Sequence, residues 1–318
     1  MASIKRKKRD APGSNNDTGF GSNASGYGGR FVNKDGSYNV RIDGASFRLR
    51  FSIYQSMLNM PRWKFALAIV LFFVLINILF TSIYVLIGAD NFQGFITTTE
   101  WGKIKELYFF STETFTTVGY GRVNPVGDGV NLVASFEAML GFLSFAIATG
   151  LIYGRFSKPK SFLVFSNHAV IAPFQDKMGL MFRVAPFKHG HILTDVQIRV
   201  TLAMQVKEEE NLTARFYTLN LERNRVDSLM MNWTVVHPLD EESPLYGYTT
   251  DDMKTADVEI YVLIRGFDEV YANIVQQRTS YTYDEIIHNA RFLPMYHESE
   301  DGKTTIFELN KLNHYKQL

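Results

Sequence analysis

The stretch that decides the fold is Thr116-Thr117-Val118-Gly119-Tyr120-Gly121, in which two glycines alternate with larger residues. Glycine adopts positive φ angles without steric cost, so this spacing predicts an extended segment with unusual backbone geometry. Such a loop can turn successive backbone carbonyls toward a dehydrated cation. Short glycine motifs also occur by chance in turns between strands, so the flanking sequence must decide between the two interpretations.

Two long apolar segments flank this stretch. They run from Ala66 to Ile87 and from Val130 to Tyr153, and each is long enough to cross a hydrocarbon core of ~30 Å. Basic residues lie at the end of each segment that is farther from the glycine stretch. Arg62 and Lys64 precede the first segment, and Arg155, Lys158 and Lys160 follow the second. Because cytoplasmic flanks carry an excess of Lys and Arg, the sequence predicts a multi-pass protein of the cell membrane with both chain ends cytoplasmic.

The segment between the two spans contains a third helical pattern. Lys103 to Phe115 is too short and too polar to cross a membrane, so we expect a re-entrant half-helix buried in protein or facing water. Its C-terminal end carries a negative partial charge, which favours a cation beside it. Residues 61–156 are therefore predicted to form a pore domain: helix, half-helix, carbonyl loop, helix.

The composition separates a membrane half from a soluble half. The 318 residues carry a net charge of +1, so overall charge indicates no particular partner. The absence of cysteine excludes disulfides, cysteine-based zinc sites and cysteine catalysis. A mean hydropathy of -0.08 is low for a chain that lies wholly within a membrane.

The N-terminal region is predicted to have two parts. Residues 1–46 are rich in Gly, Ser and Asn, which favours a flexible cytoplasmic segment. Its basic run, Lys5 to Arg9, fits a tail near anionic lipid better than a nucleic-acid site. Residues 47–60 place apolar side chains at helical spacing and predict an amphipathic helix at the membrane surface, with a soluble helix as the alternative.

From residue 157 to residue 318 the apolar periodicity becomes that of strands. Apolar residues alternate with others, and Gly, Pro, Asn and Asp separate the runs, which predicts an antiparallel β-sandwich. The candidate strands are Val196–Leu202, Val258–Ile264, Phe216–Leu221 and Thr304–Leu309. The histidines and acids of this half show neither HExxH nor nucleophile-elbow spacing, so we do not expect an enzyme.

Several further motifs accompany the glycine stretch. They are Glu113 with Thr116–Gly121, Gly154–Phe156, Phe165–Ile171, Trp233–Pro238, Asp240–Tyr246 and Arg278–Tyr281. On these motifs the chain, over about residues 47–318, resembles an inwardly rectifying potassium channel of the prokaryotic branch. The resemblance implies a homotetramer that conducts K⁺ passively through a membrane α-helical pore. It also implies a cytoplasmic immunoglobulin-like β-sandwich that extends the pore inward.

The resemblance assigns the selectivity filter and its support. The filter, where carbonyls of four copies hold the permeant K⁺, comprises Thr117, Val118, Gly119, Tyr120 and Gly121. No catalytic cofactor is implied.

Two intramembrane acids are expected to support the filter. Relatives pair the glutamate at Glu113 with an arginine two places after the last filter glycine, but here that place is Val123 and Arg122 comes one place earlier. Arg122 therefore either pairs with Glu113 or faces the outer mouth. For Glu137 we favour a hydrogen-bonded support beside the half-helix over a cation site in the cavity.

Cavity and gate residues are expected on one face of the second span. Phe145, Thr149 and Tyr153 recur at i, i+4 and i+8, and the resemblance implies that they line the cavity. Phe145 stands where strong rectifiers carry an acid, so block by cytoplasmic Mg²⁺ or polyamine should be weak. Tyr153 either narrows the inner mouth or packs between helices. Gly150 is either a hinge or a close-packing site.

The resemblance also implies sites on the cytoplasmic side. Arg62, Lys64, Arg155, Lys158 and Lys160 would bind a phosphoinositide or another anionic lipid, and positive-inside charge alone is the alternative. Asp195 would line the cytoplasmic pore or be a plain surface charge. Tyr271–Val275 would form a second constriction.

The sequence leaves two other functions open. One is a non-conducting membrane receptor or scaffold, and the other is a cation channel with relaxed selectivity.

Overall fold

The computed structural model describes residues 30–44, 52–208 and 211–318. The chain divides into two compact units, residues 43–158 and residues 1–42 with 159–318, and each is described by itself. Most of the expected flexible segment 1–46 and residues 47–51 of the expected surface helix lie outside the described residues.

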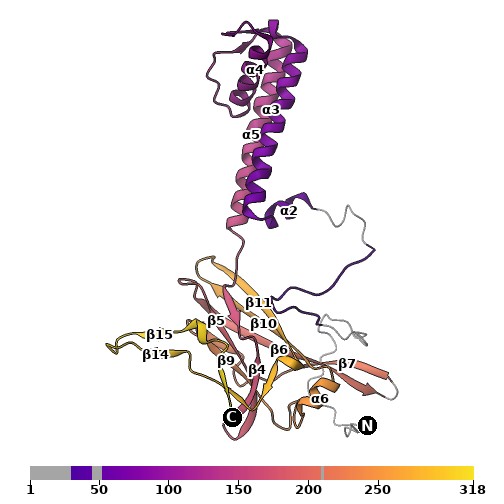
Figure 1. The fold of residues 1–318 in the computed structure, drawn as a ribbon, viewed down its shortest axis with the longest axis vertical. Helices are drawn as coiled ribbons and strands as arrows, with labels where there is room; N and C mark the ends of the chain where they lie inside the picture. Colours follow the sequence, from indigo (N-terminus) through magenta and orange to yellow (C-terminus); the bar gives the residue numbers. More distant parts are fainter. Residues whose placement is uncertain (1–29, 45–51, 209–210) are drawn as a thin grey trace. The chain divides into compact units, whose positions relative to one another are not determined.

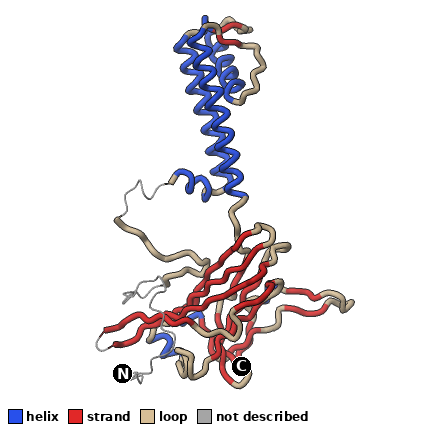
Figure 2. The backbone as a smooth tube through the Cα atoms, turned by 180° about the vertical axis from the view of Figure 1, so that it is seen from behind, coloured by secondary structure: helices blue, strands red, loops and turns tan. Residues whose placement is uncertain are grey.

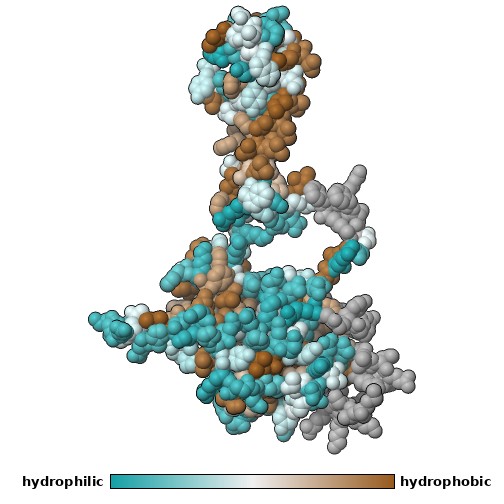
Figure 3. Space-filling view, in the orientation of Figure 1, coloured by the Kyte–Doolittle hydropathy of each residue, from teal (hydrophilic) through white to brown (hydrophobic). Residues whose placement is uncertain are grey.

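The membrane unit is helical. Its helices are α2 (Ile53–Asn59), α3 (Arg62–Ile87), α4 (Glu100–Phe115) and α5 (Asp128–Phe156). α3 and α5 are long and apolar enough to cross a membrane, and only 17% of the most apolar window of each is buried. Their apolar side chains therefore remain uncovered in one chain, as the brown surface along these helices shows in Figure 3.

The half-helix α4 packs against both long helices (Figure 1). The Thr99 side chain caps it by accepting the Gly102 N–H, so it begins three residues before the predicted Lys103. Aromatic rings hold it in place: Tyr84 of α3 meets Phe110 of α4 edge to face, with centroids 5.4 Å apart. The short strands β1 (Phe92–Gln93) and β2 (Asn124–Pro125) pair beside it.

The second unit is a sandwich of two five-stranded sheets (Figure 2). One sheet has the order β11-β10-β6-β7, with β8 also paired to β6. Its strands are β6 (Leu193–Glu208), β7 (Asn211–Thr218), β8 (Arg225–Leu229), β10 (Glu259–Asp268) and β11 (Asn273–Thr282).

The other sheet has the order β12-β4-β5-β3, with β9 paired to β5. Its strands are β3 (Leu163–Phe165), β4 (Ala169–Phe174), β5 (Lys177–Pro186), β9 (Trp233–Pro238) and β12 (Ile286–His288).

Alternating side chains of the two sheets make the core. Val196 and Leu202 of β6 and Ile260 and Ile264 of β10 are fully buried, as the period-2 pattern predicts. They pack in one cluster with Phe182 and other inward-facing residues of the second sheet. The predicted sandwich is therefore confirmed.

Two of the weaker strand predictions are wrong in their bounds. β7 ends at Thr218 because the chain then turns, so the predicted Phe216–Leu221 overlaps it by only three residues. β15 (Thr305–Phe307) is shorter than the predicted Thr304–Leu309 and pairs only with β14 (Tyr296–Glu298). A two-stranded hairpin that pairs with no further strand has few backbone hydrogen bonds to fix its length.

A C-terminal segment covers the outer face of the second sheet. β13 (Ala290–Phe292) pairs with β16 (Tyr315–Gln317), and Ala290 packs in a small buried cluster with Val170 and Met181 of that sheet. The short helical turns η1 (Ala89–Asn91), η2 (Tyr283–Glu285), η3 (Leu309–Lys311) and α6 (Thr250–Thr255) complete the described elements.

Candidate functional site: the loop after α4

The stretch Thr116–Gly121 begins where α4 ends. The Glu113 carbonyl accepts the N–H groups of Val118 and Gly119, at 2.9 and 3.2 Å. These bonds satisfy a free carbonyl of the last helical turn and bend the chain back beside the helix.

The backbone φ angles of this loop alternate between positive and negative values. Thr117, Gly119 and Gly121 have φ of 59°, 54° and 77°, whereas Val118 and Tyr120 have negative φ. A regular strand points successive carbonyls to opposite sides, and alternation between the two hands turns them toward one side instead. Thr117 also has a positive φ although its Cβ makes this conformation sterically unfavourable, so the loop contains local backbone strain. The arrangement can therefore present a column of carbonyl oxygens.

A buried carboxylate fixes α4 from behind. Glu137 of α5 is fully buried; it accepts a hydrogen bond from Ser111 of α4 and one of 2.5 Å from the Tyr84 hydroxyl of α3. One side chain thus joins all three helices. One turn further along α5, a Cβ on Gly141 would lie 1.9 Å from the Phe115 carbonyl oxygen, so only glycine lets α5 approach the end of α4 this closely.

A second carboxylate fixes the far end of the loop. Glu106 of α4 pairs with Arg122 at 2.6 Å and accepts the N–H groups of Ile96 and Thr97, at 3.3 and 3.2 Å. At Gly94 the backbone has φ of 93°, and a Cβ there would lie 1.8 Å from the Arg122 carbonyl oxygen. Glu106 therefore joins the residue after the glycine stretch to the loop that precedes α4.

Of the two alternatives for Arg122, the pairing with Glu113 does not occur within the described residues of this one chain, where Arg122 pairs with Glu106 instead. Arg122 follows a loop that runs back along α4, so it meets the helix about two turns, or ~10 Å, before Glu113. The Glu113 carboxylate makes no hydrogen bond or ion pair within the described residues of this one chain. Glu106 was missed, although it lies seven residues before Glu113 and hence on nearly the same helix face.

The expected cavity residues lie on an uncovered face of α5. Phe145 and Tyr153 are 74% and 72% exposed in one chain, and the Thr149 hydroxyl donates to the Phe145 carbonyl at 2.9 Å. Among the described residues, nothing lies within 4 Å of a Cβ built on Gly150, so none of them makes a close helix contact there.

The basic residues at the start of α3 and the end of α5 differ in their environments. The Arg155 guanidinium donates to the carbonyls of Met57 and Met60 at the end of α2, at 2.5 and 2.6 Å, and lies over the Phe65 ring. Lys158 donates to the Asn59 side chain at 2.9 Å. Three further basic residues are exposed: Arg62, Lys64 and Lys160.

In the sandwich unit, Asp195 forms an ion pair with Arg225 at 2.8 Å, beside an irregularity in the pairing of β6 with β10. The loop between β10 and β11 is fixed by Asp268, which accepts the N–H groups of Val270 and Tyr271 at 2.9 Å. Asp268 also contacts His191 at 2.8 Å. The stretch Tyr271–Val275 therefore begins in an ordered turn.

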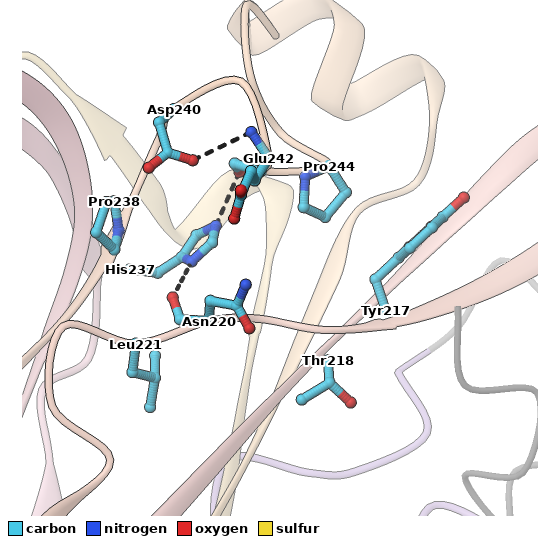
Figure 4. Close-up of a pocket in the computed structure, with 10 residues that line it drawn as sticks. Tyr217, Thr218, Asn220, Leu221, His237, Pro238, Asp240, Glu242 and Pro244 are labelled. Carbon is cyan, nitrogen blue, oxygen red and sulfur yellow. Dashed lines mark hydrogen bonds between the residues drawn. The ribbon is translucent and has the colours of Figure 1, made fainter. Parts of the chain in front are cut away.

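A small cavity lies beside the motif at residues 233–246 (Figure 4). Its wall includes His237, whose Nδ1 lies 2.6 Å from the Asn220 carbonyl and whose Nε2 lies 2.8 Å from the Ser243 hydroxyl. Burial lowers the pKa of His237, which favours a neutral ring that donates from Nδ1 and accepts at Nε2. Leu245 N–H also donates to the Ser243 hydroxyl, so this motif holds two loops together.

Comparisons with known proteins agree with this geometry. Residues 163–317 match the family model described as the inward rectifier potassium channel C-terminal domain, and residues 69–158 match an ion channel model. The inward rectifier potassium channel Kirbac3.1 of Paramagnetospirillum magnetotacticum is 31% identical over 290 residues, covering 91% of this chain and 96% of that protein. This chain belongs to the inward rectifier potassium channel family.

More distant members of the inward rectifier family also match. G protein-activated inward rectifier potassium channel 2 of Pongo abelii is 28% identical, and that of Mus musculus is 27% identical. Each alignment covers 86% of this chain, with 69% and 68% of the relatives. A solved structure of the Bacillus subtilis sporulation control protein Spo0M aligns at 10% identity with a TM-score of 0.23, over 39% of this chain and 49% of that one, which is too low to indicate a shared fold. Inward rectifiers are ion channels and not enzymes. The predictions that this chain belongs to an ion channel family and that it is not an enzyme are therefore confirmed.

The contacts of Glu106 predict a local loss of stability when it is neutralised. In Glu106→Gln the amides of Ile96 and Thr97 should exchange their hydrogens about tenfold faster, since a lost charged hydrogen bond of ~1.4 kcal/mol is a factor of ten. Arg122→Gln should have a smaller effect, because the exposed ion pair contributes less than the backbone bonds. Hydrogen–deuterium exchange of residues 94–99 measures both.

Lys105→Gln is the matched control, because it changes a charge one residue away on the exposed face of α4. Equal exchange in Glu106→Gln and in this control would contradict the role of Glu106.

Proposed function

We propose that four copies of this chain form a potassium-selective channel that conducts K⁺ passively. The observation that carries the proposal is the alternation of positive φ at Thr117, Gly119 and Gly121. Four such loops around an axis would stack rings of carbonyl oxygens that replace the hydration shell of K⁺. The exposed side chains of Val118 and Tyr120, at 53% and 80%, would then pack against neighbouring copies.

The membrane arrangement follows from the basic residues. α3 and α5 cross the cell membrane, and the ends of the chain lie in the cytoplasm, because the Lys and Arg residues cluster at the start of α3 and the end of α5. K⁺ would enter the cavity between the four α5 helices and leave through the filter, or the reverse.

Ion flux into liposomes tests the proposal and separates it from its rivals. Purified protein should pass K⁺ but little Na⁺, and Ba²⁺ should block, since Ba²⁺ has nearly the size of K⁺ and twice its charge. Gly119→Ala is the matched control: it adds one methyl group where φ is 54°, so flux should be lost while the tetramer remains.

Two results would overturn this assignment. Absence of flux in the wild-type protein would favour a non-conducting receptor or scaffold. Equal K⁺ and Na⁺ flux would favour a cation channel with relaxed selectivity.

We place the gate at the inner end of α5. Tyr153 is bulky and exposed, and four copies of a large ring near an axis can close a pore by steric contact and dewetting. Thr149 and Phe145 lie one and two turns nearer the filter on the same face. Gly150, with open space around it, would allow α5 to bend or to approach a neighbouring copy.

Tyr153→Ala should raise the steady-state K⁺ flux several-fold, because the ring of side chains is removed. Ile152→Ala is the control, since Ile152 is a neighbour on a different face of α5 and is only 41% exposed. Unchanged flux through intact Tyr153→Ala tetramers would argue against a gate at this position.

Rectification in this channel is proposed to be weak. Cytoplasmic Mg²⁺ or polyamines block strongly only where a ring of negative charge in the cavity holds them. At Phe145 the cavity face carries an apolar ring instead, and Glu137 is buried between helices rather than exposed on that face.

Phe145→Asp should create steep, voltage-dependent block by cytoplasmic Mg²⁺ in patch recordings, because four carboxylates would then face the cavity. Phe145→Asn, which is polar but uncharged, should leave block weak. Strong block in the wild-type protein that Phe145→Asp does not change would refute this prediction.

Anionic lipid is proposed to modulate the channel through the basic residues at the inner ends. Arg62, Lys64, Lys158 and Lys160 leave their charges exposed, and each such charge near an anionic leaflet contributes about 1 kcal/mol. Arg155 is already committed to carbonyls of α2, so we assign it a part in positioning α2 beside the site. Asp195 is proposed to line the cytoplasmic pore together with Arg225, which would offset its charge.

A further inference from the structure

Four polar side chains meet where α3, α4 and α5 pack against one another (Figure 1). Asn77 and Tyr84 belong to α3 and Ser111 belongs to α4. The fourth is Glu137 of α5, and all four are fully buried. A buried donor or acceptor without a partner has lost its bonds to water and gained nothing in return. The donors and acceptors of this group can therefore be counted against one another.

The side chain of Asn77 has one favourable orientation. Its Nδ2 donates to the Phe73 carbonyl at 2.7 Å, and the opposite orientation would bring two oxygens together there. Its Oδ1 therefore lies on the side of the Ser111 hydroxyl, 3.0 Å away. Among the described residues, Ser111 is the donor that Oδ1 has.

The Ser111 hydroxyl has one proton and contacts two groups that need it. One is Asn77 Oδ1, and the other is the nearer carboxyl oxygen of Glu137. The second carboxyl oxygen of Glu137 accepts the Tyr84 hydroxyl at 2.5 Å. Two hydroxyl protons thus face three acceptor oxygens. If Glu137 were ionised, one buried oxygen would have no donor.

A proton on Glu137 completes the set of hydrogen bonds. The protonated oxygen of Glu137 donates to Ser111 Oγ, and Ser111 then donates to Asn77 Oδ1. Tyr84 donates to the other oxygen of Glu137, as before. The oxygens lie in the same places whichever of them carries the proton, so the contact between Ser111 and Glu137 fits either direction of donation.

The surroundings of Glu137 also disfavour a negative charge. The sequence has no Lys, Arg or His at residues 65–102 or 123–154, which include nearly all of α3 and α5. On α4, Lys103 pairs with Glu100, and Lys105 is exposed. Among the described residues, Tyr84 is the titratable side chain that contacts Glu137. A buried charge without a cation is far more costly than a buried neutral acid.

We propose that Glu137 holds a proton and that Asn77 is the positioning residue that fixes it, by accepting the hydroxyl of Ser111. The resulting neutral chain of hydrogen bonds holds α4, and with it the filter loop, against α3 and α5. The proton and its placement rest on the contacts above, whereas the effect on conduction rests on the proposed function.

Infrared spectroscopy of the tetramer in lipid detects this proton, because the C=O stretch of a protonated carboxyl is separate from the bands of carboxylates and amides. At mildly alkaline pH, the difference spectrum between the wild-type protein and Glu137→Gln should contain one such band. Burial also raises the pKa of Glu259 in the sandwich unit to about 7, and Glu137→Gln retains Glu259, so the difference spectrum removes its contribution.

Absence of the difference band would overturn the proposal. If Glu137→Gln does not assemble, the wild-type spectrum still decides: a spectrum without any band of a protonated carboxyl would overturn the proposal equally.

Asn77→Leu tests the positioning role, because it removes Oδ1 from a side chain of similar size. Ser111 is then free to donate to Glu137, and two hydroxyl protons match the two oxygens of an ionised carboxyl. The band should therefore disappear at a pH about one unit lower than in the wild-type protein, since a tenfold change in equilibrium constant is one unit.

Thr81→Val is the matched control, because Thr81 is buried on the same helix and donates to the Asn77 backbone carbonyl at 2.6 Å, outside the chain. It should leave that pH unchanged. Size-exclusion chromatography identifies the tetramers that are compared. The same pH in Asn77→Leu and in this control would overturn the role of Asn77.

Potassium flux tests the effect on conduction. Glu137→Met removes both the donor and the acceptor, so flux should fall several-fold. Glu137→Gln replaces the O–H donor with an N–H donor, so it should restore most of the flux that Glu137→Met loses. Equal loss in both variants would overturn the role of a neutral donor. Absence of flux in the wild-type protein would count against the proposed function and leave the infrared result in place.

Discussion

The left-handed turns at Thr117, Gly119 and Gly121 are the constraint on which the membrane unit depends. A loop of alternating hand has no strand partner, and its threonine adopts a conformation that glycine adopts more easily. Such a backbone persists only where its surroundings over-determine it. Here the Glu113 carbonyl fixes its start, Glu106 fixes its end through Arg122, and Glu137 fixes the helix that carries it.

The large elements could be predicted from the sequence because their patterns are long. An apolar run such as Ala66–Ile87 has few alternatives to a membrane span, and α3 includes all of it. The alternation in Val196–Leu202 and Val258–Ile264 identified the inner faces of two central strands, because period 2 survives any uncertainty in their ends. The three-residue strand β15 carries too few residues for the pattern to fix its bounds, whereas the apolar run that predicted β7 continues past Thr218, where the strand ends.

The contacts that hold the loop in place could not be predicted in the same way. The pairing of Glu106 with Arg122 depends on how far the loop returns along α4, and no local pattern encodes that distance. The sequence also does not reveal which partner a charged side chain takes. Arg155 was predicted as an anionic-lipid residue or a positive-inside charge, and in the structure its guanidinium donates to carbonyls at the end of α2. Glycines were informative where a backbone approaches closely, as at Gly94 and Gly141, but only the tertiary contact reveals why.

The position of Arg155 has a mechanical consequence for the helix that contains it. Its guanidinium supplies the donors for carbonyls of Met57 and Met60, which α2 leaves unpaired at its C-terminal end. Tyr153 precedes it by two residues on the same rigid helix. A rotation of this part of α5 must therefore either remove the donors from those carbonyls or move α2 with it. A force on α2 is in the same way transmitted through Arg155 to the part of α5 that carries the Tyr153 ring.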